Sequence, residues 1–97
     1  MSDPIGQVFG ALADPSRRHV LGVIAARGTV TATELTGDLP ITRQAVAKHL
    51  ATLAGAGLVE GSRQGRETRY RLTLAGEEWD DRLDALRLHL ERHQPQS

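Results

Sequence analysis

The chain has 97 residues, and its twelve basic and twelve acidic side chains give a formal net charge of zero. It contains no cysteine, which excludes disulfides, thiolate nucleophiles and cysteine-ligated zinc. No run of about 18 apolar residues and no signal peptide is visible, so we expect one cytoplasmic domain, residues 1–97, without a membrane partner.

Two helices are predicted before residue 28. The first carries an apolar stripe at helical spacing, formed by Ile5, Val8, Phe9 and Leu12. Asp14-Pro15 ends this helix and begins the next, because the carboxylate can accept a hydrogen bond from a free N–H group and proline suits the first helical position. Gly28 ends the second helix.

A short helix, a tight connection and a longer helix are predicted over residues 31–57. Thr31 and Glu34 fit a capping box, in which each side chain satisfies a free backbone N–H group. Thr42 is placed to cap the longer helix, and Gly57 to end it in a left-handed conformation. This order is typical of a helix-turn-helix.

The helix that begins at Thr42 has an apolar and a polar side. Val46, Leu50 and Leu53 form the apolar stripe. Arginine pairs with guanine, glutamine pairs with adenine, and lysine binds phosphate. We therefore predict DNA contacts from the polar side, namely Thr42, Arg43, Gln44, Ala47, Lys48 and His49. The alternative is plain solvent exposure for Arg43 and Gln44, and a partly buried packing role for His49.

A basic β-hairpin, the predicted wing, follows over residues 58–72. Its tip is placed at Gln64-Gly65, since glycine supplies the backbone freedom of a tight turn. Arg63, Gln64 and Arg66 lie nearest the tip, and we predict that they contact DNA.

The zero net charge hides a basic block. Residues 42–72 carry a charge of +4, and the rest of the chain carries −4. The local field rather than the net charge attracts phosphate. Strand alternation places Arg69 and Arg71 on one face, where they can instead pair with acids such as Glu60.

The last predicted helix spans residues 74–93. Its apolar stripe recurs at steps of four, three and four residues, whereas Leu88 lies off the stripe. One face of this helix can serve its own core and another a partner. With the helix of residues 1–13 it predicts a homodimer interface of Ile5, Val8, Phe9, Leu12, Trp79, Leu83, Leu86 and Leu90.

Five helices and a two-stranded hairpin predict a mainly α, winged helix-turn-helix fold. In this fold the third helix braces the fourth, which enters the major groove, and the wing reaches neighbouring phosphates or the minor groove. A two-fold dimer spaces its reading helices about 34–36 Å apart, so we expect an inverted-repeat operator.

The stretches ALADPSRRHVLGVI and TATELTGDLPITRQAVAKHLATLAGAGLVEGSRQGRETRYRLT resemble the ArsR family of bacterial regulators. The resemblance covers about residues 5–73. It is carried by DPSRR, by T-x-x-x-V-x-x-H-L-x-x-L from Thr42 to Leu53, by AGLV and by the basic GR-E-x-R-Y wing. It implies a homodimeric transcriptional repressor that binds double-stranded DNA. Such a repressor dimerises through its first and last helices and is released from DNA by an inducer.

The sequence departs from the family's metal-sensing members. Their thiol site has a Cys-x-Cys pair where this chain has Thr31 and Thr33, and hydroxyls are poor ligands for soft metals. The Asp-x-His pair of the family's second site is missing from the last helix. We predict no metal site and no cofactor, with His89 and His93, spaced i, i+4, as the open alternative.

Two other functions fit the sequence less well. A winged helix used only for protein–protein contact usually lacks the basic reading face and wing that this chain has. An enzyme is disfavoured because there is no cysteine, no glycine-rich phosphate loop and no Ser-His-acid grouping. The sequence leaves three alternatives for the inducing signal: a small molecule, a partner protein, or no inducer at all.

Overall fold

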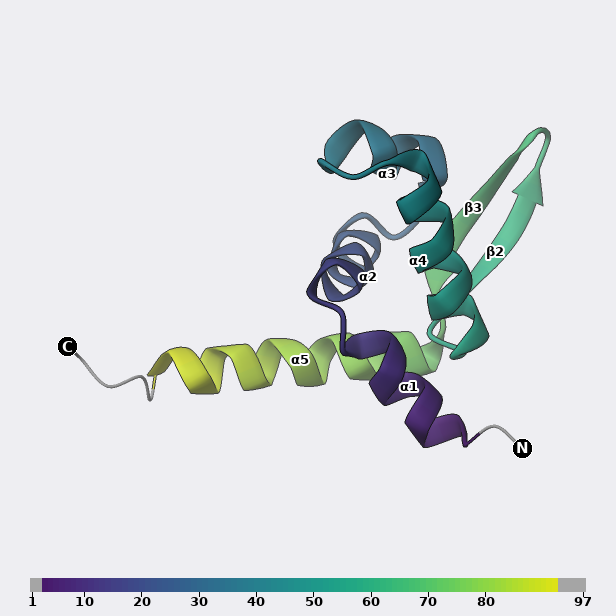
Figure 1. Cartoon of the computed structure of the whole chain (residues 1–97). Coiled ribbons are helices and arrows are strands. Elements are labelled where there is room, and N and C mark those ends of the chain that lie inside the picture. The colour runs from purple at the N-terminus through teal and green to yellow at the C-terminus, as the bar shows by residue number, and fades with distance from the viewer. Residues whose placement is uncertain (1–2, 93–97) are drawn as a thin grey trace.

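The computed structural model describes residues 3–92. Within them the chain forms five helices and three strands: α1 (Pro4–Leu12), α2 (Pro15–Arg27), β1 (Val30–Thr31), α3 (Ala32–Asp38), α4 (Arg43–Gly55), β2 (Val59–Gln64), β3 (Glu67–Leu72) and α5 (Leu74–Arg92). The predicted mainly α, winged helix-turn-helix fold is confirmed. Figure 1 shows α3, the start of α4 and the wing tip at one end of the molecule, and α1 and α5 at the other.

The sheet has one strand more than the predicted hairpin. β3 lies between β2 and β1 and is antiparallel to both. β1 is only Val30-Thr31, which pair with Tyr70 and Arg69. A segment this short shows no alternation in the sequence, and its pairing depends on the tertiary fold. Because Val30 is fully buried, β1 joins the wing to the core.

The core forms where α2, α3, α4 and the base of the sheet meet. Its buried apolar residues are Ala11, Leu12, Val20, Leu21, Ile24, Val30, Leu35, Val46, Leu50, Leu53, Leu58 and Val59. The predicted apolar stripe of α4 is therefore confirmed. Full burial of each large aliphatic side chain contributes about 1.5–3 kcal/mol. The burial of this stripe holds the polar side of α4 toward solvent.

The predicted helix starts are confirmed by their hydrogen bonds. At α2, Asp14 Oδ1 accepts from the N–H of Ser16 at 2.8 Å. At α3, Thr31 and Glu34 form the reciprocal capping box. At α4, Thr42 Oγ1 accepts from the N–H of Ala45 at 3.1 Å. These side chains satisfy N–H groups that have no partner within the helix.

α4 ends in a Schellman motif around Gly57. Its φ of +78° lies in the left-handed region that favours glycine. The N–H of Gly57 bonds to the carbonyl of Ala54, and the N–H of Leu58 bonds to that of Leu53, both at 3.0 Å. The helix stops at Gly55, and the predicted role of Gly57 is confirmed.

The end of α4, the base of the wing and the start of α5 meet at Leu58. The N–H of Thr73 donates to the carbonyl oxygen of Leu58 at 3.1 Å. The hydroxyl of Thr73 donates to the carbonyl of Gly57 at 2.6 Å and accepts from the N–H of Gly76 at 3.1 Å. A Cβ atom at Gly76 would overlap the carbonyl oxygen of Leu58, so only glycine allows this close approach.

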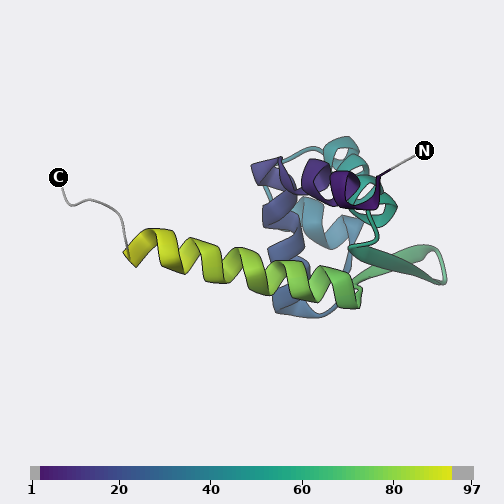
Figure 2. The same cartoon turned by 90° about the horizontal axis from the view of Figure 1, so that it is seen from below.

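α5 has 19 residues and extends beyond the rest of the molecule on the side opposite the wing (Figures 1 and 2). It begins at Leu74 as predicted, and the last predicted residue of this helix lies outside the described part of the chain. Across residues 3–92, no helix is both long and apolar enough to cross a membrane.

Gly76→Ala tests the joint at Leu58. We expect the free energy of unfolding to fall by at least about 1–3 kcal/mol, because the added methyl group meets backbone rather than a flexible side chain. Gly37→Ala is the matched control, since a Cβ there meets open space on a helix; it should be neutral or stabilising by about 0.4–1 kcal/mol. Equal stability of the two variants in urea titrations would contradict this account.

Candidate nucleic-acid interface

The outward side of α4 carries most of the predicted DNA contacts. Five of the six predicted residues are exposed: Thr42, Arg43, Gln44, Ala47 and Lys48. Val46 and Leu50, on the opposite side, are buried. Within residues 3–92, neither Arg43 nor Lys48 forms an ion pair. Their positive charges are therefore available to an anionic ligand.

Arg43 is oriented by a residue that sequence reasoning missed. Its Nη2 donates to Thr33 Oγ1 on α3 at 3.4 Å. The resemblance places Thr33 at a thiol-ligand position, and in the structure its hydroxyl contacts the first residue of α4. No sequence pattern predicts this bond, because it depends on how α3 crosses α4.

His49 differs from the other five residues. Its side chain is half-buried, and its Nδ1 is buried with no hydrogen-bond partner within residues 3–92. A base contact needs an accessible ring nitrogen, so Nδ1 is not available for one. The burial of Nδ1 supports the packing role, which was the alternative for this residue, and a DNA contact through Nε2 stays a prediction.

The wing tip is a two-residue turn. Gln64 pairs with Glu67, which places Gly65 and Arg66 at the centre of the turn, one residue beyond the predicted tip. Gly65 has a φ of +62°, and glycine at the first central position is typical of a type II′ hairpin turn. Arg63 Nε donates to the carbonyl of Gly65 at 3.1 Å.

The four arginines of the wing fall into two pairs. Arg63 and Arg66 are exposed and, within residues 3–92, form no ion pair. Arg71 Nε lies 2.7 Å from Glu60 Oε1, as expected. Arg69 Nη1 lies 3.3 Å from Oε1 of Glu34, which ties the wing to α3. Exposed pairs contribute about 0–1 kcal/mol, so the effect of both is mainly on orientation.

Glu34 joins α3, β1 and β3. Its Oε1 accepts from the N–H of Thr31 at 2.9 Å and also meets Arg69. The hydrogen bonds from Thr31, first through the backbone and then through the side chain, hold the pKa of Glu34 below its ordinary value of 4.5, and the charges of Arg69 and Arg27 act in the same direction. The ionised carboxylate is therefore the form that the fold favours.

The predicted dimer residues divide into two groups. Ile5, Phe9, Leu86 and Leu90 are 64%, 58%, 54% and 55% exposed. Val8, Trp79 and Leu83 are half-buried against the core of their own chain. Leu12 is only 7% exposed and belongs to that core, although it also borders the groove between α2 and α5, so its place in a dimer interface stays a prediction.

An apolar groove runs between α2 and α5 beside the end of α1. Its apolar lining includes Phe9, Val23, Trp79, Leu83, Leu86 and Leu90. The rings of Phe9 and Trp79 meet edge to face with centroids 5.6 Å apart, so α1 contacts α5. Asp80 borders the groove; burial, together with the charges of Asp84 and Asp81, raises its pKa.

The threonines at the family's thiol-ligand positions have other partners. Thr31 Oγ1 accepts from the N–H of Glu34 at 3.1 Å, and Thr33 Oγ1 accepts from Arg43. No group of three histidine or acidic side chains among residues 3–92 could hold a metal ion. His93 lies outside the described residues, so the alternative of a site at His89 and His93 stays open.

Comparison with known proteins agrees with this geometry. Residues 12–62 match a family described as a helix-turn-helix domain. The chain is 43% identical over 77 residues to the uncharacterised HTH-type transcriptional regulator YuzN of Bacillus subtilis, covering 73% of this chain and 80% of YuzN. It is 33% identical over 104 residues to the arsenic resistance transcriptional regulator ArsR1 of Pseudomonas putida, covering 93% of this chain and 81% of ArsR1.

A solved structure is similar over nearly the whole fold. It is the homodimeric winged helix-turn-helix DNA-binding domain of Mb0332 from Mycobacterium bovis, a possible ArsR-family regulator, with 25% identity, a TM-score of 0.78 and coverage of 96% of this chain and 83% of that one. The chain belongs to the ArsR family of winged helix-turn-helix transcriptional regulators. This ArsR-family protein is thus a DNA-binding regulator and not an enzyme.

Glu34→Gln tests the clamp between α3 and the wing through its pH dependence. Because the pKa of Glu34 is lower in the folded chain, its stabilisation is present above the unfolded pKa of about 4.5 and is lost as pH falls through the folded value. We expect a shallower acid loss of stability for Glu34→Gln, whose amide oxygen can still cap Thr31. Thermal melts from neutral to about pH 3 measure it.

Glu78→Gln, at an exposed carboxylate on α5, is the control and should follow the wild-type curve. If the melting temperature of Glu34→Gln fell with pH in parallel with that of the wild type, the ionised carboxylate of Glu34 would not stabilise the fold.

Proposed function

We propose that this ArsR-family protein is a homodimeric repressor that binds an inverted-repeat operator, with the start of α4 in the major groove and the wing on flanking phosphates. One observation carries the proposal. The start of α4, with its exposed polar residues, and the wing tip lie at the same end of the molecule, opposite α1 and α5, which carry exposed apolar residues (Figure 1).

The side chains of α4 fit distinct contacts on DNA. Arg43 can donate two hydrogen bonds to guanine, and Gln44 can exchange two with adenine. The small Ala47 lets the helix approach the bases closely. Thr42 at the helix N-terminus and Lys48 farther along suit phosphate oxygens. We therefore assign base reading to Arg43 and Gln44, and positioning on the DNA backbone to Thr42 and Lys48.

The wing supplies a second contact with the same duplex. Arg66 lies at the centre of the turn and Arg63 just before it, and both are exposed. Neither is neutralised by an ion pair within residues 3–92. Arginines at a narrow hairpin tip suit flanking phosphates or the minor groove. Gln64 lies beside them and completes the predicted set.

A second copy of this chain is the proposed occupant of the apolar groove. The homodimeric Mb0332 domain, which shares the fold, supports this assignment. Leu86 and Leu90 are more than half exposed on a helix half that extends beyond the rest of the chain (Figure 2). Symmetric pairing of such faces buries them and repeats the reading helix about 34–36 Å away. Occupation of the operator by the dimer is the proposed means of repression.

Selection of bound DNA from a random pool tests the proposal directly, and an inverted repeat is the expected result. On the selected site, Arg43→Ala should weaken binding by about 1–3 kcal/mol, the usual value of a bidentate base contact. Its affinity for unrelated DNA should change much less. Fluorescence anisotropy with both DNAs measures the difference.

Arg66→Ala provides the contrast, since loss of a phosphate contact should weaken binding to both DNAs alike and reduce the salt slope by about one unit. Arg92→Ala, at the far end of α5, controls for loss of a positive charge. Equal losses on both DNAs for Arg43→Ala would show that Arg43 does not read bases.

Leu86→Glu tests the proposed dimer. A carboxylate placed in an apolar interface loses its hydration, so the variant should sediment as a monomer at concentrations where the wild type is dimeric. Leu74→Glu makes the same change at an 80% exposed leucine near the start of α5, and it should stay dimeric. Dimeric Leu86→Glu would place the interface elsewhere.

A further inference from the structure

We propose that Arg17 is a positioning residue for operator binding, which fixes α1 relative to α4 and so sets the geometry between the two reading helices of a dimer. The inference rests on the proposed homodimeric function. It deepens that function by naming the side chain that connects the dimer-forming end of the chain to the DNA-binding end.

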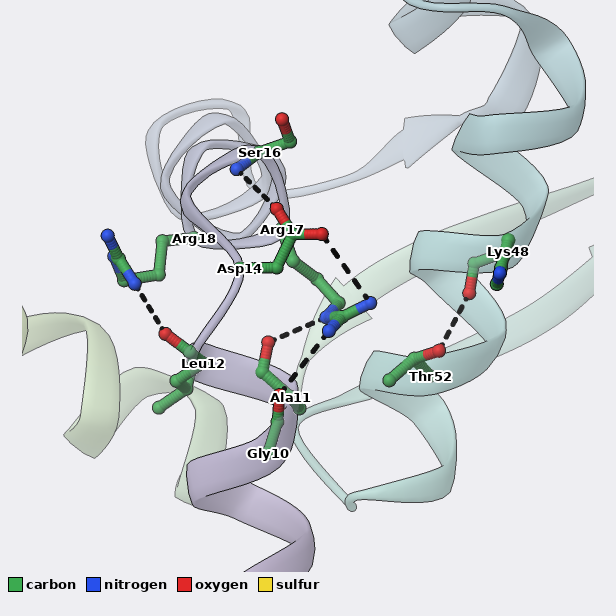
Figure 3. Close-up of polar contacts among 9 residues, drawn as sticks. All are labelled: Gly10, Ala11, Leu12, Asp14, Ser16, Arg17, Arg18, Lys48 and Thr52. Atoms are coloured by element: carbon green, nitrogen blue, oxygen red, sulfur yellow. Dashed lines mark hydrogen bonds and ion pairs between the residues drawn. The ribbon is translucent and has the colours of Figure 1, made fainter.

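Arg17 caps the end of a helix other than its own. α1 has no basic residue in its last turn, and Arg17, on α2, reaches back to it (Figure 3). Its Nε donates to the carbonyl of Ala11 at 2.6 Å, and its Nη2 donates to that of Gly10 at 3.3 Å. A guanidinium at a helix C-terminus satisfies carbonyls without partners and opposes the negative end of the helix dipole.

The same guanidinium also reaches the start of α2. Arg17 Nη1 lies 4.0 Å from Oδ2 of Asp14, the N-cap residue, and the Arg17 side chain is only 14% exposed. The neighbouring Arg18 donates from Nη1 to the carbonyl of Leu12 at 2.6 Å. The last three carbonyls of α1 thus bond to two consecutive arginines of α2, which restricts rotation of α1 about its short connection to α2.

α1 joins the two functional ends of the molecule. Its Ile5 and Phe9 are exposed, and Phe9 contacts Trp79 of α5. α1 also packs against α2 and α4. Asp14, at this joint, also interacts with α4. The pKa of Asp14 is lowered mainly by the backbone hydrogen bond from Ser16, and the charges of Arg17 and of His49 on α4 lower it further.

A change of angle at this joint would act on a dimer rather than on a single reading helix. In the proposed dimer each half-site is read by α4 of one protomer. Arg17 is not among the residues proposed to contact DNA. Simultaneous binding of two half-sites requires the correct distance and angle between both α4 helices, and the gain from bivalent binding is lost when the geometry does not match. Arg17 should therefore control the advantage of a full operator over a half-site.

The test compares the selected inverted repeat with the same DNA carrying one scrambled half-site. Arg17→Met keeps a long apolar stem but has no donors, and we expect the ratio of full-site to half-site affinity to fall about tenfold while half-site affinity stays nearly constant. We also expect a weaker or shifted preference among operators whose half-sites are one base pair closer or farther apart. A loss of stability alone would not change that preference.

Arg27→Met is the matched control, because Arg27 lies on the same helix and pairs with Asp38 away from α1; its ratio should equal that of wild type. Arg17→Lys keeps the charge without the planar fork and should give an intermediate ratio. It is the deciding variant if Arg17→Met does not fold. Sedimentation and thermal melts establish that each variant is a folded dimer.

The outcomes separate the two proposals. A wild-type ratio and spacing preference in a folded Arg17 variant would overturn the positioning role. Equal losses on full and half sites would also overturn it, because they indicate a direct or general effect. Failure of the wild-type protein to prefer any sequence would instead overturn the proposed operator binding.

Discussion

The hydrogen bonds between Thr73 and the backbone of Gly57 and Leu58 determine how the parts of this molecule are arranged. At that point α4 has just ended, the wing begins and returns, and α5 starts with Gly76 against the backbone of Leu58. A wing that leaves from the end of α4 must run back alongside it, so both reach the same end of the molecule. α5 leaves in another direction and extends on the side opposite the wing (Figure 2).

The distribution of positive charge follows from which arginines have partners inside the fold. Arg69 and Arg71 pair with carboxylates, and Arg17 and Arg18 bond to the end of α1. The guanidinium groups of these four are thus held by contacts within the fold. Within residues 3–92, Arg43, Lys48, Arg63 and Arg66 on α4 and the wing are exposed and form no ion pair, and the same holds for Arg82 and Arg92 on α5. A chain with zero net charge can in this way present a positive surface to DNA.

The local part of this fold was predictable from sequence because caps and periodic burial depend on near neighbours. The capping box at Thr31, the cap at Thr42 and the end at Gly57 are examples. Features that depend on how distant elements pack against one another were not predictable from sequence. They are the strand β1, the hydrogen bond between Thr33 and Arg43, and the burial of Leu12 within its own chain. Helical periodicity identifies an apolar face, but it does not show whether the same chain or another covers that face.

The short wing tip also bears on the thermodynamics of binding. Only Gly65 and Arg66 lie outside the paired strands, and Arg63 braces the turn through the carbonyl of Gly65. Ordering one flexible residue costs about 1–2 kcal/mol in conformational entropy. A longer, unpaired tip would lose that entropy for several residues on meeting DNA, whereas this hairpin loses most of it during folding. In the proposed complex the arginines of the wing therefore meet the duplex with little conformational entropy left to lose.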